Sequence, residues 1–372
     1  MAALDGLRGL AALVVIVRHC VNAMPMPREW RYGLYESPLA VVLSSHGAVA
    51  LFFVLSGWVL SASLERGSSD PRTWLSFYVR RVFRIHVPFV AAALTAFALS
   101  RVWSVPDPDA VSRWLADSAI HPRFGAVLAS LDFPGTAAGL VPVGWTLEIE
   151  MIYSLALPGL LLLARAARGL LLLAAATAGL LTHWSTVWYG FDFALGIVAF
   201  RERDAIARAV RLIPLVLRAA IPIVGVAGIS APLWYRVVPR GEIMGRTPVE
   251  IAVMGIGSLL LVTSAVALPA FGKALGARPF VWLGALSYSI YLLHRPLITL
   301  LAPHVLVPTI LASKLIVVKG VTTASSFCLI GIVLVISTVL AIPFHRWVER
   351  PAITGGRRAA TWLQRQLAPT AS

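Results

Sequence analysis

Runs of apolar residues about as long as a bilayer is thick recur along the whole chain, and they restrict its fold more than any other feature. A helix needs roughly 20 such residues to cross the hydrocarbon core. With 58% hydrophobic and 13% charged residues, the 372-residue chain has too few polar side chains to cover a soluble domain. We therefore expect an all-α fold, a polytopic membrane helix bundle that crosses the cell membrane many times.

The apolar runs predict about ten transmembrane helices. The segment 303–321 is also apolar, but it contains Pro308, Lys314 and Lys319. We expect a loop or a re-entrant piece there, with an eleventh span as the alternative. The predicted spans are 5–24, 46–64, 86–103, 142–164, 169–183, 188–200, 213–235, 249–270, 281–302 and 322–344, of which the fifth and sixth are short.

Lysine and arginine are unevenly shared between the two sets of alternate loops. The richer set contains the segments 65–84, 201–218 and 346–365. By the positive-inside rule this set is cytoplasmic, so both termini lie inside. An eleventh span would carry the basic C-terminal tail outside, which counts against it. We expect a multi-pass protein of the cytoplasmic (inner) membrane.

The chain is expected to form one integral-membrane domain, residues 1–350, followed by a basic cytoplasmic tail, 351–372. Its net charge of +15 does not indicate nucleic acid as a partner, because the basic residues are scattered among apolar spans. Cys20 and Cys328 lie in apolar segments with no ligand spacing around them. We therefore expect neither a metal site nor a disulfide framework.

The first span carries ionisable residues within LDGLRGLAALVVIVRH, residues 4–19. Such residues are costly in a bilayer and are candidates for function. Arg8 and His19 are about three helical turns, or roughly 16 Å, apart and share a face, whereas Arg18 lies off it. The alternative is that Arg8 reaches the inner headgroups and His19 is a packing residue.

A carboxylate of the fourth span is expected beside His19. The span begins GWTLEIEMIYSLALP and enters from the outside, so Glu150 lies at a depth similar to that of His19. A carboxylate next to an imidazole would fix its tautomer and raise its basicity, as a general base requires. A purely structural ion pair is the alternative.

An arginine cluster precedes the third span in FYVRRVFRIHVPF. Arg80 and Arg81 stand four and three residues before Arg84, so either can join Arg84 on one helical face. Arginine binds phosphate and pyrophosphate in bidentate fashion, which makes the cluster a candidate anion site. Positive-inside topology alone also places arginines here.

Two other spans contain polar or small residues at membrane depth. ALFFVLSGWVLS places Ser56 and Gly57 in mid-membrane, where small residues allow helices to approach closely. SYSIYLLHRP carries Tyr291 and His294 on one face, three residues apart. This polar stripe is either part of a site or an interhelical packing contact.

Six of these stretches, taken in chain order, resemble the motifs of one family. It is the integral-membrane acyltransferases that include bacterial O-antigen acetylases, Nod-factor acetylases and macrolide acyltransferases. One departure is Ala50, where many members have an aspartate. Each stretch alone is permissive, but six in order are specific: LDGLRGLAALVVIVRH, LFFVLSGWVLS, YVRRVFRIHVP, GWTLEIEMIY, LGALSYSIYLLHRP and FHRWVERP.

The resemblance implies that an acyl group, often acetyl from acetyl-CoA, is transferred to a hydroxyl of a sugar or related acceptor. It implies His19 as the base, with Arg8, Arg81 and Arg84 on the acyl-CoA side; we place Arg80 with them. In our hypothesis Glu150 orients His19, and His294, Tyr291 or Ser56 donates to the oxyanion. No bound cofactor is expected, and acyl-CoA is a co-substrate.

The expected partners are acyl-CoA, the lipid bilayer and a hydroxylated acceptor, whether a glycan, a glycolipid or a macrolide-like molecule. Nothing in the long outer segment 104–141 identifies this acceptor. The rival interpretation is a proton-coupled transporter or flippase in which His19, Glu150 and Asp192 form a relay. A carrier of that kind does not need the cytoplasmic arginine cluster, which favours the transferase.

Overall fold

The computed structural model describes residues 1–24, 28–65, 70–102, 112–116, 125, 127–128, 140–182, 185–235, 247–312 and 323–367. Within these residues all the regular structure is helical, as the apolar runs predicted. The elements are α1 (Ala2–Ala23), α2 (Arg28–Glu36), α3 (Ala40–Leu43), α4 (Ser45–Leu64), α5 (Pro71–Val102), α6 (Arg113–Ala116), α8 (Gly144–Ala166), α9 (Arg168–Leu181), α10 (Ser185–Arg201), α11 (Arg203–Leu212), α12 (Leu215–Tyr235), α13 (Pro248–Ala267), α14 (Pro269–Leu275), α15 (Arg278–Ala312), α16 (Thr323–Phe344), the π-helical turn η3 (His345–Glu349) and α17 (Arg350–Gln366).

Each predicted span coincides with one of these helices. Six helical segments of the described chain are long and apolar enough to cross a membrane. The protein is thus a polytopic helical membrane protein, while ten crossings and cytoplasmic termini stay predictions. The six are Ser45–Leu64, Pro71–Arg101, Gly144–Ala166, Leu215–Trp234, Pro248–Ala267 and Phe327–Gln366.

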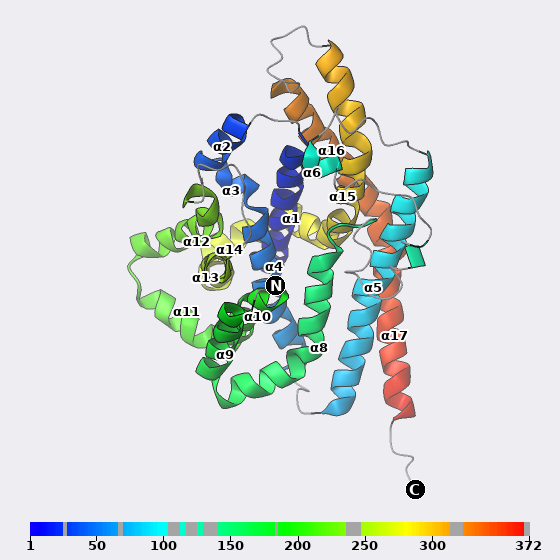
Figure 1. The fold of residues 1–372 in the computed structure, drawn as a ribbon. Helices are drawn as coiled ribbons and strands as arrows, with labels where there is room; N and C mark the ends of the chain where they lie inside the picture. The colour runs from blue at the N-terminus through cyan, green and yellow to red at the C-terminus, as the bar shows by residue number, and fades with distance from the viewer. Residues whose placement is uncertain are drawn as a thin grey trace.

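Two segments near the C-terminus, residues 303–312 and the predicted basic tail, are helical. Residues 303–312 continue α15 as helix, so this part of 303–321 is not an irregular loop, while a re-entrant piece and an eleventh span stay predictions; residues 313–321 lie outside the described residues. The predicted basic tail forms α17, which packs along α5 (Figure 1). There Gly356 lies against the Phe83 side chain, so the tail is part of the packed bundle.

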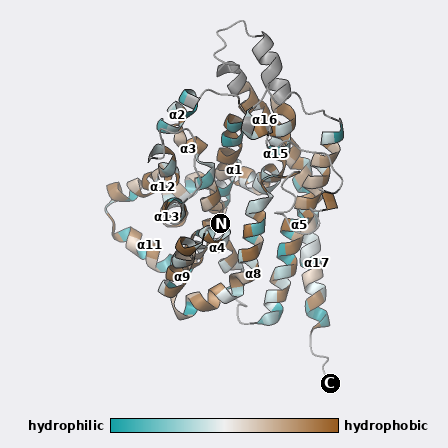
Figure 2. Cartoon of the chain, in the orientation of Figure 1, coloured by the Kyte–Doolittle hydropathy of each residue, from teal (hydrophilic) through white to brown (hydrophobic). Residues whose placement is uncertain are grey.

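The outward faces of several helices are apolar. Leu181 of α9 is 78% exposed and Val216 of α12 is 82% exposed, and Figure 2 shows hydrophobic colours along these helices. Water would make such surfaces unfavourable, whereas lipid chains solvate them. This distribution agrees with a chain whose outer surface faces a bilayer.

Helix α1 lies at the centre of the bundle, with α4 and α15 packed beside it (Figure 1). The contact with α15 is close because Gly9 and Gly284 face the partner backbone. A Cβ added at Gly284 would collide with the carbonyl oxygen of Asp5. Small residues that bring helix backbones together are the usual means of helix association in membranes. This approach lets Arg8 reach the α15 backbone.

A second glycine contact joins α4 to α10. A Cβ on Gly57 would collide with the carbonyl oxygen of Phe193, and one on Gly196 with that of Val54. The close approach predicted for Gly57 is therefore confirmed. The two glycine contacts thus hold α15 against α1 and α4 against α10, and α1, α4 and α15 all contribute to the lining of the site.

Candidate active site

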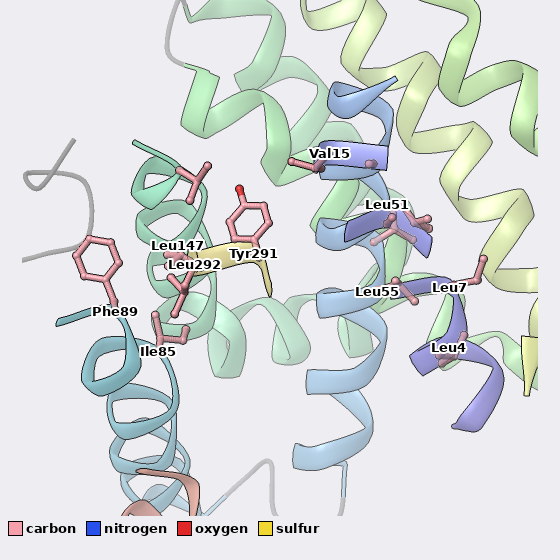
Figure 3. Packing of buried hydrophobic residues seen from close by; sticks show 14 of the residues in the cluster. Leu4, Leu7, Val15, Leu51, Leu55, Ile85, Phe89, Leu147, Tyr291 and Leu292 are labelled. Carbon is pink, nitrogen blue, oxygen red and sulfur yellow. The ribbon is translucent and has the colours of Figure 1, made fainter. Parts of the chain in front are cut away.

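A cavity of about 150 Å³ lies among α1, α4, α5, α8 and α15. Its lining combines ionisable and hydroxyl-bearing side chains with apolar ones. Figure 3 shows Tyr291 together with Leu147 of α8 and Leu55 of α4, two apolar residues that also line the cavity. The ionisable and hydroxyl-bearing side chains of the lining are Asp5, Arg8, Ser56, Arg81, Arg84, Thr146, Glu150, Ser287, Tyr288 and Tyr291.

Arg8 is held in this cavity from two helices. Its Nε donates to Ser287 Oγ at 3.0 Å and its Nη2 donates to the carbonyl oxygen of Gly284 at 2.9 Å. Asp5, one turn earlier on α1, forms an ion pair with it at 3.1 Å. The guanidinium is therefore fixed in orientation while still facing the cavity.

Glu150 does not contact His19 in the way we expected. Its carboxylate accepts a hydrogen bond from Nη2 of Arg81, whose Nε donates to Ser154 Oγ at 3.1 Å. The cause is the face of α8 on which Glu150 lies, because that face is packed against α5. A buried guanidinium needs a carboxylate more than a neutral imidazole does, so Arg81 takes this partner.

The arginine cluster divides between two environments. Arg81 and Arg84 line the cavity, whereas Arg80 lies next to α17, with its Cα 3.4 Å from the position of a Cβ added at Gly356. Arg80 is therefore not brought together with Arg8. Arg81 is paired with Glu150 and Arg8 with Asp5, so among the lining arginines Arg84 is the one without an ion pair in the described residues.

His19 has His294 as its partner. Its Nδ1 lies 2.9 Å from Nε2 of His294, and the two rings are stacked. Nδ1 of His294 lies 2.7 Å from the carbonyl oxygen of Tyr291. A carbonyl oxygen only accepts, so in the neutral pair Nδ1 of His294 carries hydrogen, its Nε2 accepts, and Nδ1 of His19 donates. This tautomer leaves Nε2 of His19 unprotonated.

Tyr291 separates the histidine pair from the cavity. Its ring centroid is 5.6 Å from that of His294, and its hydroxyl lies 2.8 Å from Oγ1 of Thr146. Thr146 donates its own hydroxyl hydrogen to the carbonyl oxygen of Val143, so Tyr291 is the donor in the contact between them. Tyr291 and Thr146 both line the cavity, but neither histidine does.

Comparison with known proteins shows to which family the chain belongs. The family model described as "Acyltransferase domain" matches residues 1–346, nearly the whole chain. The chain belongs to this acyltransferase family. It is also similar to "Protein 2 in picA locus" of Rhizobium radiobacter, with 30% identity over 159 residues, which is 40% of this chain and 76% of that protein. No solved structure matches.

The hydrogen bonds in the site show which of the three expected oxyanion donors is still available to a substrate. Both ring nitrogens of His294 are occupied by hydrogen bonds, and the Tyr291 hydroxyl is directed at Thr146. Ser56 lines the cavity from α4. Of the three candidates, Ser56 is therefore the one that takes no part in the hydrogen bonds of His294 and Tyr291.

Several site residues were not found from the sequence. Nothing in the spacing of residues around Thr146 in GWTLE predicts its contact with Tyr291. The Trp114 ring packs 5.3 Å from that of His19, between centroids, and the guanidinium of Arg295 lies 3.7 Å above that indole. Glu349 of the acyltransferase is buried and accepts from Ser289 Oγ at 2.6 Å. These contacts cross the bundle. Thr146, Arg295 and Glu349 each stand within one of the six motifs, but the motifs do not show which residues they contact.

The residues of the rival proton relay are not brought together. His19 bonds with His294, Glu150 with Arg81, and both oxygens of the buried Asp192 lack a hydrogen-bond partner among the described residues. Asp192 lies against Gly255 of α13. In the described part of the chain, no group of three or more His, Cys, Asp or Glu side chains is placed to hold a metal ion.

Proposed function

We propose that this acyltransferase is a membrane-embedded O-acyltransferase that moves an acyl group, in the first instance acetyl, from cytoplasmic acyl-CoA to a hydroxyl of a carbohydrate or other hydroxylated acceptor. The observation that carries the proposal is the hydrogen-bonded chain from Nδ1 of His19 through His294 to the Tyr291 carbonyl. It leaves Nε2 of His19 as an oriented base. The family membership and the arginine-lined cavity support it.

The donor binds from the predicted cytoplasmic side, in the cytoplasmic (inner) membrane. The phosphates of acyl-CoA contact Arg84 and Arg8, because phosphate oxygens match the planar guanidinium fork. Arg8 is suited to this role because Ser287 and Gly284 fix its orientation. The pantetheine arm enters the apolar part of the cavity, and the thioester lies at its Tyr291 end.

Transfer begins when Tyr291 moves away from Thr146 and the cavity joins the space beside His19. Nε2 of His19 then takes the proton of the acceptor hydroxyl, and the oxygen forms a bond to the thioester carbonyl carbon. Ser56 donates to the oxyanion, in the manner of an oxyanion hole. The carbon–sulfur bond breaks, and the CoA thiolate takes the proton back from His19, so ester and free CoA are the products.

His294 is a positioning residue in this scheme. It holds the Nδ1 hydrogen of His19 and so keeps the lone pair of Nε2 directed away from the pair. The ion pair between Arg81 and Glu150 supports the cavity wall, which is a different role from the orienting of His19 that we first expected for Glu150.

The test is acyl transfer by the purified full chain in detergent, with radiolabelled acetyl-CoA and a panel of hydroxylated acceptors. We expect His19→Ala to lower the transfer rate about 100-fold or more, as for loss of a general base. His294→Ala should lower it less. The matched control is His86→Ala, which removes an imidazole of α5 outside the cavity lining and should transfer normally. Transfer by His19→Ala at the wild-type rate would show the assignment to be wrong.

A single-turnover experiment separates direct transfer from an acyl-enzyme. The protein is mixed with labelled acetyl-CoA without acceptor, quenched and separated from free label. Direct transfer predicts that no label stays on the protein. Label retained by wild type and lost in His19→Ala or Ser56→Ala would identify a covalent carrier instead.

A further inference from the structure

Three buried hydrogen-bond donors without an acceptor lie together next to His19, where α1 meets α2. They are Nη1 of Arg18, Nε of Arg31 and the hydroxyl of Tyr35. Arg18 is 5% exposed, and its guanidinium carbon lies 4.2 Å from the centroid of the Tyr35 ring. A buried donor without a partner is unfavourable, and a charged one in a membrane protein more so.

The charges of this cluster are also uncompensated. Within the described residues no carboxylate forms an ion pair with Arg18 or Arg31. The acids of α2, Glu29 and Glu36, are exposed on that helix. Arg31 makes one hydrogen bond, from Nη2 to the carbonyl oxygen of Met24 at 3.4 Å. The buried Arg18 and the half-buried Arg31 therefore bring two positive charges and three donors without a partner to the same region.

We propose that Arg18, Arg31 and Tyr35 form a subsite for an anionic group, a phosphate or a carboxylate, carried by the acceptor. The inference rests on the proposed function, because it takes the acceptor hydroxyl to be the group that His19 deprotonates. Arg18 directly precedes His19 on α1. An acceptor anchored by its anionic group at α2 would present a nearby hydroxyl to Nε2 of His19.

The chemistry of the three groups favours an anion over a neutral polar group. A neutral hydroxyl or amide would satisfy the donors but leave the buried charge of Arg18, next to that of the half-buried Arg31, without a counter-charge. Burial raises the pKa of the Tyr35 hydroxyl, against the opposite effect of the charges of Arg18 and Arg31, so the phenol keeps its proton near neutral pH. It therefore acts as a third donor to an anion with several acceptor oxygens.

The experiment measures binding of three related probes to the purified full chain in a maltoside detergent, by titration calorimetry. The probes are glucose 1-phosphate, glucuronate and the neutral methyl glucoside. Charge-assisted hydrogen bonds should make the anionic probes bind at least about tenfold more tightly than the neutral one. Arg31→Gln and Tyr35→Phe should reduce this preference. The matched control, Arg101→Gln, removes an exposed arginine from the outer end of α5 and should leave it unchanged.

Arg18→Gln changes the most buried residue of the three, so this variant can fail to fold. In that case Arg31→Gln and Tyr35→Phe still test the proposal. Equal binding of the three probes, or a preference that survives both milder variants, would overturn the proposal. A lipid phosphate is the competing source of the same chemistry. Organic phosphate that copurifies with wild type but not with Arg31→Gln, and that the sugar probes do not displace, would assign the subsite to a headgroup and overturn its assignment to the acceptor.

Binding is measured without acyl-CoA, and it is repeated in His19→Ala. The subsite therefore stands or fails independently of the transfer reaction. If anionic probes bind through Arg31 while no acyl transfer is seen, the proposed function fails and the subsite stands. If transfer occurs without any preference for anionic acceptors, the subsite fails and the proposed function stands.

Discussion

Loss of the hydrogen bond between Tyr291 and Thr146 should allow acyl-CoA to be hydrolysed without acceptor. This contact separates the cavity from the histidine pair, and Tyr291 is its donor. In Tyr291→Phe the ring stays and the donor is removed. A hydrogen bond of this kind contributes about 1 kcal/mol, so its loss shifts the balance between closed and open arrangements about fivefold. We expect the acceptor-independent hydrolysis of acetyl-CoA to rise by this factor.

The assay follows release of free CoA thiol from acetyl-CoA by the purified protein without acceptor. Thr146→Val also removes the bond, whereas Thr146→Ser keeps the hydroxyl and serves as the matched control with a wild-type rate. Because the two variants break the same contact, the double variant should hydrolyse no faster than either single one. Unchanged hydrolysis in Tyr291→Phe, or fully additive effects, would refute the idea that this contact closes the cavity.

Three further predictions concern stability and assembly. Glu150→Gln leaves the Arg81 guanidinium without its carboxylate and should lower the free energy of unfolding by about 3 kcal/mol, measured by titration with a denaturing detergent; an unchanged value would mean that the pair contributes little. Gly284→Ala should separate α1 from α15 at a cost of about 1–3 kcal/mol and raise the KM for acetyl-CoA, and a normal KM would contradict the role of that contact. The Asp70 carboxylate accepts a hydrogen bond from the backbone N–H of Arg72, which holds the pKa of Asp70 below its usual value. Asp70→Ala should therefore lower the melting temperature near neutral pH, and the difference from wild type should vanish as the pH falls through that lowered pKa. A difference in melting temperature that does not depend on pH would exclude this origin.

The helices of this protein could be predicted because hydrophobicity is a local property of the sequence. Every predicted span coincides with a helix, and the short approach at Gly57 follows from residue size alone. The family could also be predicted, because the six motifs and their order can be read from the sequence alone. Helical spacing predicted a shared face for Arg8 and His19, but it did not predict the cavity, which Arg8 lines and His19 does not.

The partners of the polar residues could not be predicted in the same way. Depth along a span does not say which neighbour its face meets, so Glu150 was expected beside His19 although α8 directs it to Arg81. His19 and His294 are 275 residues apart, and no local pattern joins them. Arg80 shows the same limit, because helical spacing places it near Arg84 but does not reveal that α17 packs beside it.

The pairing of the first long helix with a late one has a consequence for biosynthesis. Arg8 meets Ser287, 279 residues further along the chain. At roughly 5 to 20 residues per second, α1 waits on the order of 15 to 55 seconds before α15 has been translated. During that interval Arg8 lacks Ser287 and Gly284, and His19 lacks His294. Ionisable residues of this kind are the ones that lipid tolerates least. Nascent chains that stop before α15 should therefore be recognised as unfinished and degraded by membrane proteases, so quality control of this protein is tied to completion of its C-terminal third.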